Sequence, residues 1–156
     1  MQLSEQELVR RQKLNELKQL GIEPYPAPLF PVNTTTANIK AHYKGEENKS
    51  AFSNVCLAGR IMSIRDMGKA SFAVLQDSTG KIQLYIKRDE ICPGEDKTLY
   101  DKVWKHLTDI GDILGVEGYV FTTKTGETSV HVSRITFLSK ALMALSSFRA
   151  PFPPLA

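Results

Sequence analysis

Apolar and polar residues alternate in several short segments from residue 55 onward. The clearest case is 81–87, where Ile82, Leu84 and Ile86 alternate with Lys, Gln and Tyr. A period of two is typical of a strand with one buried face. The other strand-like segments, bounded by turn-forming residues, are 55–64, 70–76, 113–123 and 128–138. The pattern therefore predicts five β-strands.

A helical pattern occupies the N-terminal part of the chain. Between residues 4 and 20, apolar residues recur at helical spacing among basic and polar ones. Ser4 followed by Glu7 is a capping-box signature, in which side chains satisfy the first free amides of a helix. Gly21 then supplies a left-handed C-terminal stop. A first helix is therefore expected over residues 4–20.

Two further segments have helical spacing. Residues 36–43 form a short candidate helix, with Asn33 or Thr34 as the expected N-cap. The charged segment 95–107 carries apolar residues at helical intervals. Because this segment follows the third predicted strand and precedes the fourth, the expected order is three strands, one helix and two strands.

That order is the plan of the OB-fold, a partly open barrel that binds oligonucleotides or oligosaccharides. Gly59 in the first strand suits a strongly bent strand that needs a residue without a side chain. A β-sandwich is the alternative, but the helix position and the short hairpins favour the barrel. The predicted fold is mainly β with helices: a five-stranded OB-fold Greek-key barrel preceded by an N-terminal helical extension. The expected divisions are 1–50 for the extension, 51–142 for the barrel and 143–156 for an atypical tail.

One face of the predicted barrel carries residue types suited to single-stranded RNA. If the apolar positions fill the interior, Phe72 and Gln83 on neighbouring strands point outward. A Phe is a platform for an unstacked base, worth about 1–3 kcal/mol per base, and an amide can read a base edge. Arg65 and Lys69 are close in sequence and suit contacts with phosphate or base. A core Phe and a solvated Gln are the ordinary alternatives.

Composition adds little to this interpretation. The net charge is +3, with 42% hydrophobic and 24% charged residues, as in a soluble globular protein. No apolar run approaches the ~20 residues that span a bilayer, and the N-terminus does not resemble a secretion signal. A cytoplasmic protein without membrane association is therefore expected. Basic residues outnumber acidic ones between Arg60 and Arg88, which suits either a phosphate-attracting face or a solvated surface balanced elsewhere.

No other chemistry is indicated. Cys56 lies in an apolar run and is expected to be a buried reduced thiol, whereas Cys92 falls in a polar loop where it could react. The three histidines, His42, His106 and His131, lie far apart with no further ligand at metal-binding spacing. No catalytic triad, phosphate loop or carboxylate pair is found. Catalytic, cofactor-binding and metal-binding residues are therefore not expected.

Six blocks of the sequence follow one another in a recognisable order. They are Ala58-Gly59-Arg60-Ile61-Met62, Met67-Gly68-Lys69-Ala70-Ser71-Phe72, Leu75-Gln76-Asp77, Ile82-Gln83-Leu84-Tyr85, Asp109-Ile110-Gly111-Asp112-Ile113, and Thr123-Lys124-Thr125-Gly126-Glu127 with Ser129-Val130-His131. In this order they resemble the N-terminal anticodon-binding domain of class II, bacterial-type lysyl-tRNA synthetases. The resemblance runs from about Ser4 to Leu142.

This resemblance implies recognition of the uridine-rich anticodon of lysine tRNA. Phe72 resembles the family's stacking residue for the central anticodon uridine. Arg65 and Gln83 resemble residues that contact that base and its surroundings, and Glu127 matches an acidic residue at a hairpin tip that helps to read an anticodon base. The expected nucleic-acid-binding residues are Arg65, Lys69, Phe72, Gln83 and Glu127.

The resemblance stops after Leu142. In the family a linker leads from there into a large catalytic domain, and residues 143–156 do not resemble that linker. We therefore expect that this chain alone forms no aminoacyl-adenylate, and that ATP and Mg²⁺ belong to the catalytic domain. Two alternatives to a tRNA-binding module are an excerpt of a full-length active lysine–tRNA ligase and a stand-alone protein-interaction module. The resemblance implies that full-length family members are dimers, whereas a monomer or a weak homodimer is expected for this chain.

Overall fold

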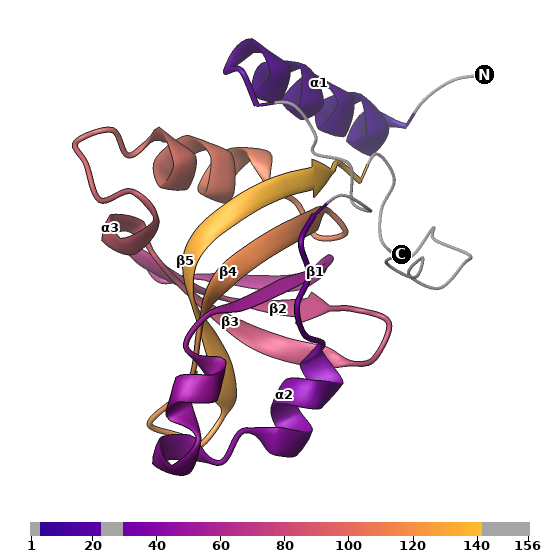
Figure 1. The fold of residues 1–156 in the computed structure, drawn as a ribbon. Coiled ribbons are helices and arrows are strands. Elements are labelled where there is room, and N and C mark those ends of the chain that lie inside the picture. The colour runs from indigo at the N-terminus through magenta and orange to yellow at the C-terminus, as the bar shows by residue number, and fades with distance from the viewer. Residues whose placement is uncertain (1–3, 23–29, 142–156) are drawn as a thin grey trace.

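Five strands form a closed barrel (Figure 1). In the computed structural model, the described residues are 4–22 and 30–141. The strands are β1 (Val55–Asp66), β2 (Ala70–Gln76), β3 (Lys81–Lys87), β4 (Ile113–Thr122) and β5 (Thr128–Ser139). Around the barrel they follow the order β1-β2-β3-β5-β4, and β1 pairs with β4 to close it. Only the β3–β5 pair is parallel, so the predicted OB-fold is confirmed.

The strand alternation is also confirmed. β2 and β3 have the predicted bounds, whereas β1 continues two residues beyond the predicted end. Ile82, Leu84 and Ile86 are fully buried in the barrel, and the residues between them, Gln83 and Tyr85, are half-buried on the outer face. This alternation follows from the pleat of a strand, which sends successive side chains to opposite faces.

Helices cover both ends of the barrel and one side. They are α1 (Glu5–Gln19), α2 (Thr36–His42), α3 (Arg88–Ile91), the 3₁₀ turns η2 (Gly45–Glu47) and η3 (Lys49–Phe52), and the π-helical η4 (Leu99–Leu107). Figure 1 shows α1 and η4 near one end of the barrel and α2 near the other. Among the described residues, no helix is both long and apolar enough to cross a membrane.

The ends of α1 match the sequence signals. The Ser4 hydroxyl accepts a hydrogen bond from the Glu7 amide at 3.1 Å, which satisfies one free donor of the first turn. Gly21 has φ +81°, the left-handed conformation that glycine adopts without steric cost. Both predicted helix signals are therefore confirmed.

The cap of α2 was assigned to the wrong residue. Thr35, not Asn33 or Thr34, is the N-cap, and its hydroxyl accepts from the Asn38 amide at 3.1 Å. The Asn33 side chain has another role, because its carbonyl oxygen accepts a hydrogen bond from the amide of Cys56 at 2.8 Å. Asn33 thereby fixes the chain before α2 to the start of β1.

The segment between β3 and β4 differs from the single predicted helix. The Asp96 carboxylate accepts a hydrogen bond from the Thr98 amide at 2.9 Å, and the longer helix begins only at Leu99. Such a local side-chain bond competes with helix formation. The short α3 was not predicted. Cys92 follows it and is buried rather than accessible in a polar loop, and Cys56 is a buried free thiol as predicted.

Gly59 allows β1 and β2 to approach closely. A Cβ atom at this position would lie 2.4 Å from the carbonyl oxygen of Gln76. The pairing of β1 with β2 shifts register between Ile61 and Ser63, just beyond this contact. The predicted need for a residue without a side chain in the bent first strand is confirmed.

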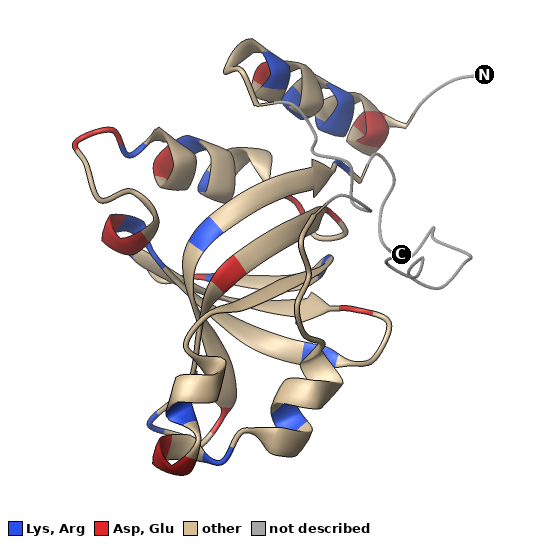
Figure 2. Ribbon diagram, viewed as in Figure 1, with Lys and Arg blue, Asp and Glu red and all other residues tan. Residues whose placement is uncertain are grey.

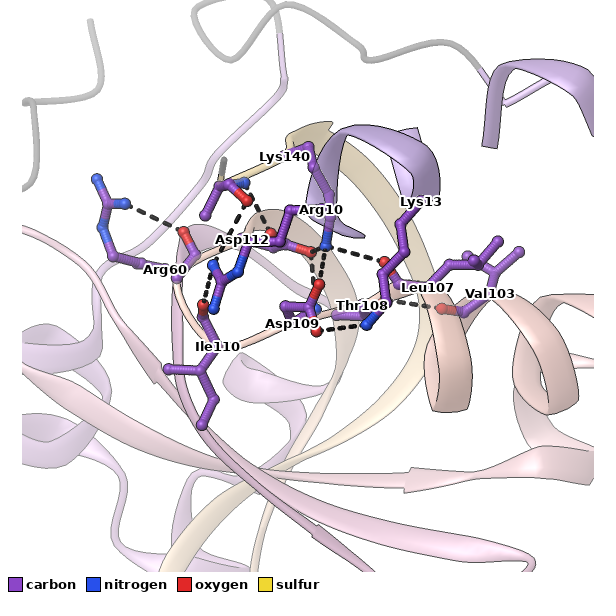
Figure 3. A network of polar contacts seen from close by, with 12 residues as sticks. Arg10, Lys13, Arg60, Val103, Leu107, Thr108, Asp109, Ile110, Asp112 and Lys140 are labelled. Atoms are coloured by element: carbon purple, nitrogen blue, oxygen red, sulfur yellow. Dashed lines mark hydrogen bonds and ion pairs between the residues drawn. The ribbon is translucent and has the colours of Figure 1, made fainter. Parts of the chain in front are cut away.

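A buried polar network attaches α1 to the end of the barrel (Figure 3). The fully buried Asp112 accepts hydrogen bonds from the Lys140 ammonium at 2.7 Å and from the Ala141 amide at 2.8 Å. Lys140 also contacts Asp109 at 2.6 Å, and Asp109 forms an ion pair with Lys13 of α1 at 2.7 Å. Burial alone would raise the pKa of Asp109, but hydrogen bonds with the two lysines hold it below its ordinary value.

Charged residues of both signs are interspersed over the surface. In Figure 2, basic and acidic positions alternate along α1 and occur together on η4 and α3. This mixture agrees with the small net charge of +3. The expected tail at 143–156 lies outside the described residues.

Candidate nucleic-acid interface

A groove of about 640 Å³ lies on the outer face of β1, β2 and β3, beside the turn between β4 and β5. Three of the five predicted site residues line it: Arg65, Phe72 and Gln83. Lys124 at the turn lines it as well. A groove of this size, with apolar walls and a few polar groups, has the properties of a ligand site.

Strand register brings these three residues together. Arg65 on β1 is the direct partner of Phe72 on β2, and Phe72 is the direct partner of Tyr85 on β3. Gln83 on β3 pairs with Val74 on β2. These two residues lie two positions along their strands from Tyr85 and Phe72, and therefore on the same face of the sheet. Residues two apart on one strand share a face, so the side chains gather over about two pleats of the sheet.

Aromatic rings form the floor of the groove. The half-buried Phe72 ring lies 5.0 Å from Tyr85, centroid to centroid, at an interplanar angle of 45°. Tyr85 in turn contacts the edge of Phe121 at 6.0 Å. Rings packed against each other in this way are held in place before a ligand arrives. The floor is therefore a preformed platform on which a base can stack.

The polar groups of the groove are available for a ligand. Among the described residues, neither the Arg65 guanidinium nor the Gln83 amide has a hydrogen bond or ion pair. Arg65 is exposed and Gln83 is half-buried. An amide offers a donor and an acceptor, and a guanidinium offers several donors in one plane. The pair can thus read the edge of a stacked base and contact a phosphate.

The other two predicted residues lie at the margins. Lys69 is exposed in the β1–β2 turn and does not line the groove, while its carbonyl oxygen accepts from the Arg88 amide at 2.9 Å. Glu127 is exposed on the β4–β5 hairpin, across from the turn residues that do line the groove. Its amide donates to the Thr123 hydroxyl at 3.0 Å.

The local excess of basic residues between 60 and 88 does not form one face. Arg60 donates to the carbonyl oxygen of Gly111 at 3.0 Å, on the side of the α1 network. Arg88 pairs with Asp89 at 3.2 Å. Of the basic residues in that range, only Arg65 lines the groove. This stretch therefore fits the other expectation better: its basic residues belong to a solvated surface and are balanced by acidic residues elsewhere in the fold.

The β4–β5 hairpin was expected beside the site through Glu127, but the hairpin residues that form the groove wall were missed. Phe121, Thr123, Lys124 and Thr125 all line the groove. Phe121 faces outward because its neighbour Val120 is buried, and this alternation was readable in the sequence. The approach of the hairpin to β3 was not readable, because it depends on the parallel pairing of β3 with β5.

His131 continues the aromatic surface away from the groove. It lies 5.2 Å from Tyr85 and 4.7 Å from Tyr119, the latter in a stacked arrangement. Burial lowers the pKa of His131; Glu90 opposes this effect and Lys87 adds to it. Within residues 4–22 and 30–141, no group of three or more His, Cys, Asp or Glu residues is placed to hold a metal.

Comparison with known proteins agrees with this architecture. Residues 55–138 match the family model described as an OB-fold nucleic acid binding domain, which carries the tRNA anticodon in its name. A lysine–tRNA ligase of Porphyromonas gingivalis is 58% identical over 145 residues, covering 93% of this chain and 25% of the ligase. The lysine–tRNA ligase of Christiangramia forsetii is 56% identical, covering 92% of this chain and 24% of the ligase.

A more distant relative shows the same match. The lysine–tRNA ligase of Staphylococcus haemolyticus is 44% identical over 149 residues, covering 92% of this chain and 29% of that protein. The chain thus spans about a quarter of the length of the curated relatives that it matches. The matched family region covers the five strands of the barrel except for Ser139, the last residue of β5. The chain belongs to this family of OB-fold nucleic acid binding domains, in its tRNA anticodon-binding form, and is similar to part of lysine–tRNA ligases.

Proposed function

We propose that this chain binds the anticodon loop of lysine tRNA through the groove on β1, β2 and β3. The observation that carries the proposal is the preformed aromatic floor with unpaired polar groups beside it: Phe72 packed on Tyr85, next to Arg65 and Gln83. The family assignment supports nucleic acid as the ligand, and the names of the relatives support lysine tRNA.

In this proposal each residue has a distinct role. Phe72 stacks on the central uridine of the anticodon, because its ring forms the groove floor. Gln83 reads the Watson–Crick edge of that base with its amide, and Arg65 contacts the base or its phosphate. Lys69 and Glu127 contact neighbouring nucleotides from the two turns at the margins.

The activity of a whole ligase is a separate matter. The relatives are named for joining lysine to tRNA, and this chain corresponds to about a quarter of their length. We assign it tRNA recognition, with ATP and Mg²⁺ acting in the remaining part of a full-length ligase. The same proposal places the chain in the cytoplasm and gives it at most a weak tendency to form homodimers.

Replacing Phe72 by Ala tests the proposal. Loss of a stacking platform is worth about 1–3 kcal/mol per base, so the Kd for a lysine tRNA anticodon stem-loop should rise about 5- to 150-fold. Fluorescence anisotropy with labelled RNA measures this change. Phe72→Trp keeps an aromatic face and should retain most of the affinity.

Tyr43→Ala is the matched control. Tyr43 is also a half-buried aromatic residue, but it packs edge-on against Phe52 at 5.6 Å and does not line the groove. Its truncation should lower the free energy of unfolding without changing RNA affinity. If Phe72→Ala binds the stem-loop as tightly as the unaltered chain, the groove is not the binding site.

A further inference from the structure

One residue from each strand contributes to a continuous row on the outer face of the barrel. Each residue is the direct cross-strand partner of the next. From β1 through β2, β3 and β5 to β4, the row reads Arg65, Phe72, Tyr85, His131 and Tyr119. The groove takes in the first three of these residues, so the row extends beyond it by His131 and Tyr119.

Tyr119 ends the row with an accessible ring. Its residue surface is 40% exposed, which is high for a large side chain on a barrel strand. One ring face stacks on His131, with centroids 4.7 Å apart and planes only 9° from parallel. Phe121 contacts it edge-on at 6.4 Å. The stack against His131 restrains the tyrosine, while its exposed surface can accept a further flat group.

His131 supports Tyr119 from behind. It is buried, and its Nδ1 atom has no hydrogen-bond partner among the described residues. Tyr85 packs against the same imidazole on the other side of the row, at 5.2 Å. The three rings therefore form one packed cluster between the groove and the far end of the row, with Tyr119 stacked on His131 and Tyr85 meeting it edge-on.

We propose that Tyr119 is a second stacking position, occupied by another nucleobase of the same RNA strand whose base stacks on Phe72. The proposal rests on the proposed function, because it extends the same interface. Adjacent strands lie about 4.8 Å apart, so the three strand steps from Phe72 to Tyr119 span about 14 Å along the sheet. OB-folds hold about 4–16 nucleotides of single strand, and such a span lies within that reach.

Charge around Tyr119 favours stacking over phosphate attraction. Glu90 is close enough to act on both Tyr119 and His131, and Lys87 acts on His131 with the opposite sign. For Tyr119 itself the nearby charge is the negative one of Glu90, which repels a phosphate rather than attracting it. The contribution of Tyr119 should therefore be nearly independent of salt, unlike that of Arg65, which should weaken as salt rises.

A fluorescent-base scan tests the proposal with the full chain. Anticodon stem-loops of lysine tRNA are made with 2-aminopurine at one loop position at a time, since stacking on an aromatic ring quenches its fluorescence. Tyr119→Ala should restore fluorescence at a loop position different from the one restored by Phe72→Ala. It should also raise the Kd about five- to tenfold, the lower part of the range for one stacked base.

Three variants control for structure. Tyr119→Phe keeps the ring and should behave like the unaltered chain. Tyr119→Leu fills similar space without a π-face, so it should reproduce the loss even if Tyr119→Ala disturbs the barrel. Ile110→Ala truncates another side chain that is 40% exposed, in the loop that contacts α1, and should leave binding unchanged.

The outcomes separate the two proposals. If Tyr119→Leu binds as tightly as the unaltered chain while Phe72→Ala weakens binding, Tyr119 only stabilises the barrel and the second position is refuted. A loss of affinity that disappears at high salt would refute it too, because it would indicate a phosphate contact. If Phe72→Ala has no effect either, the proposed function itself fails.

Discussion

His131 is a buried ring between Tyr85 and Tyr119, and its surroundings lower its pKa. Burial disfavours the charged imidazolium and lowers the pKa of His131. Of the charged groups nearby, Glu90 raises this pKa and Lys87 lowers it further. Because the pKa in the folded chain lies below that in the unfolded chain, the unfolded state binds a proton more readily as pH falls.

The difference between the folded and unfolded pKa of His131 sets the direction in which stability changes with pH. The contribution of His131 to the free energy of unfolding is fully present above the ordinary histidine pKa of about 6.5. It is lost progressively as pH falls from there toward the lower folded pKa. Urea unfolding at pH 7 and pH 5 should show that His131→Phe loses less stability on acidification than the unaltered chain does. Equal losses in the two proteins would show that the folded state protonates His131 freely.

The direction of a single side chain was predictable where the alternation along one strand fixes it. Phe72 and Gln83 point outward as predicted, because alternation along β2 and β3 fixes the face of each side chain. The N-cap of α2 was not predictable, because Asn33 and Thr34 are equally good caps and the choice depends on the bond from Asn33 to β1. The burial of Cys92 was not predictable, because it depends on α3, for which the sequence has no strong signal.

At the scale of elements, the attachment of α1 depends on charges buried at the end of β5. The Lys140 side chain is 1% exposed and contacts both Asp109 and the fully buried Asp112. Lys13 on α1 completes the network from the more exposed side, where the lysine is 26% exposed. Arg10 adds hydrogen bonds to the carbonyl oxygens of Ile110 and Ala141. One network thus joins the helix, the loop before β4 and the end of the last strand.

Lys140→Met should therefore be strongly destabilising. It leaves Asp112 buried without its cationic partner, and removal of one member of a buried pair costs about 3–5 kcal/mol. Lys13→Met is the matched comparison, because it removes a partly exposed partner of the same Asp109 and should cost about 1 kcal/mol or less. Chemical denaturation measures both. A cost for Lys140→Met no larger than that for Lys13→Met would contradict the structural role of the buried network.

The elements themselves were largely readable from the sequence. All five strands were predicted from apolar patterns and turn residues, and α1 from its N-cap and Gly21. The segment 95–107 was less readable, because its apolar spacing does not show that Asp96 makes a local bond with the Thr98 amide. Local hydrogen bonds of this kind shift helix ends without changing the hydrophobic pattern.

At the scale of the whole molecule, the groove exists only because distant strands pair in the barrel. β1, β2 and β3 supply Arg65, Phe72 and Gln83, whereas the wall with Phe121 and Lys124 comes from the last hairpin. The parallel pairing of β3 with β5 brings that hairpin into place across about 45 residues of chain. Strand patterns predicted the floor of the site but contain no signal for this long-range pairing. The hairpin was placed beside the site only through the family resemblance at Glu127, and the residues of the wall were missed.

The central claim is that this face reads the anticodon of lysine tRNA, and base discrimination tests it most directly. The full chain should be titrated with the lysine tRNA anticodon stem-loop and with the same stem-loop carrying a changed central base. A base that leaves the half-buried Gln83 amide unpaired should bind at least about fivefold more weakly. Gln83→Met keeps the size of the side chain but removes its hydrogen-bonding groups, so it should reduce this difference. Equal affinity of the unaltered chain for the two stem-loops would contradict the account.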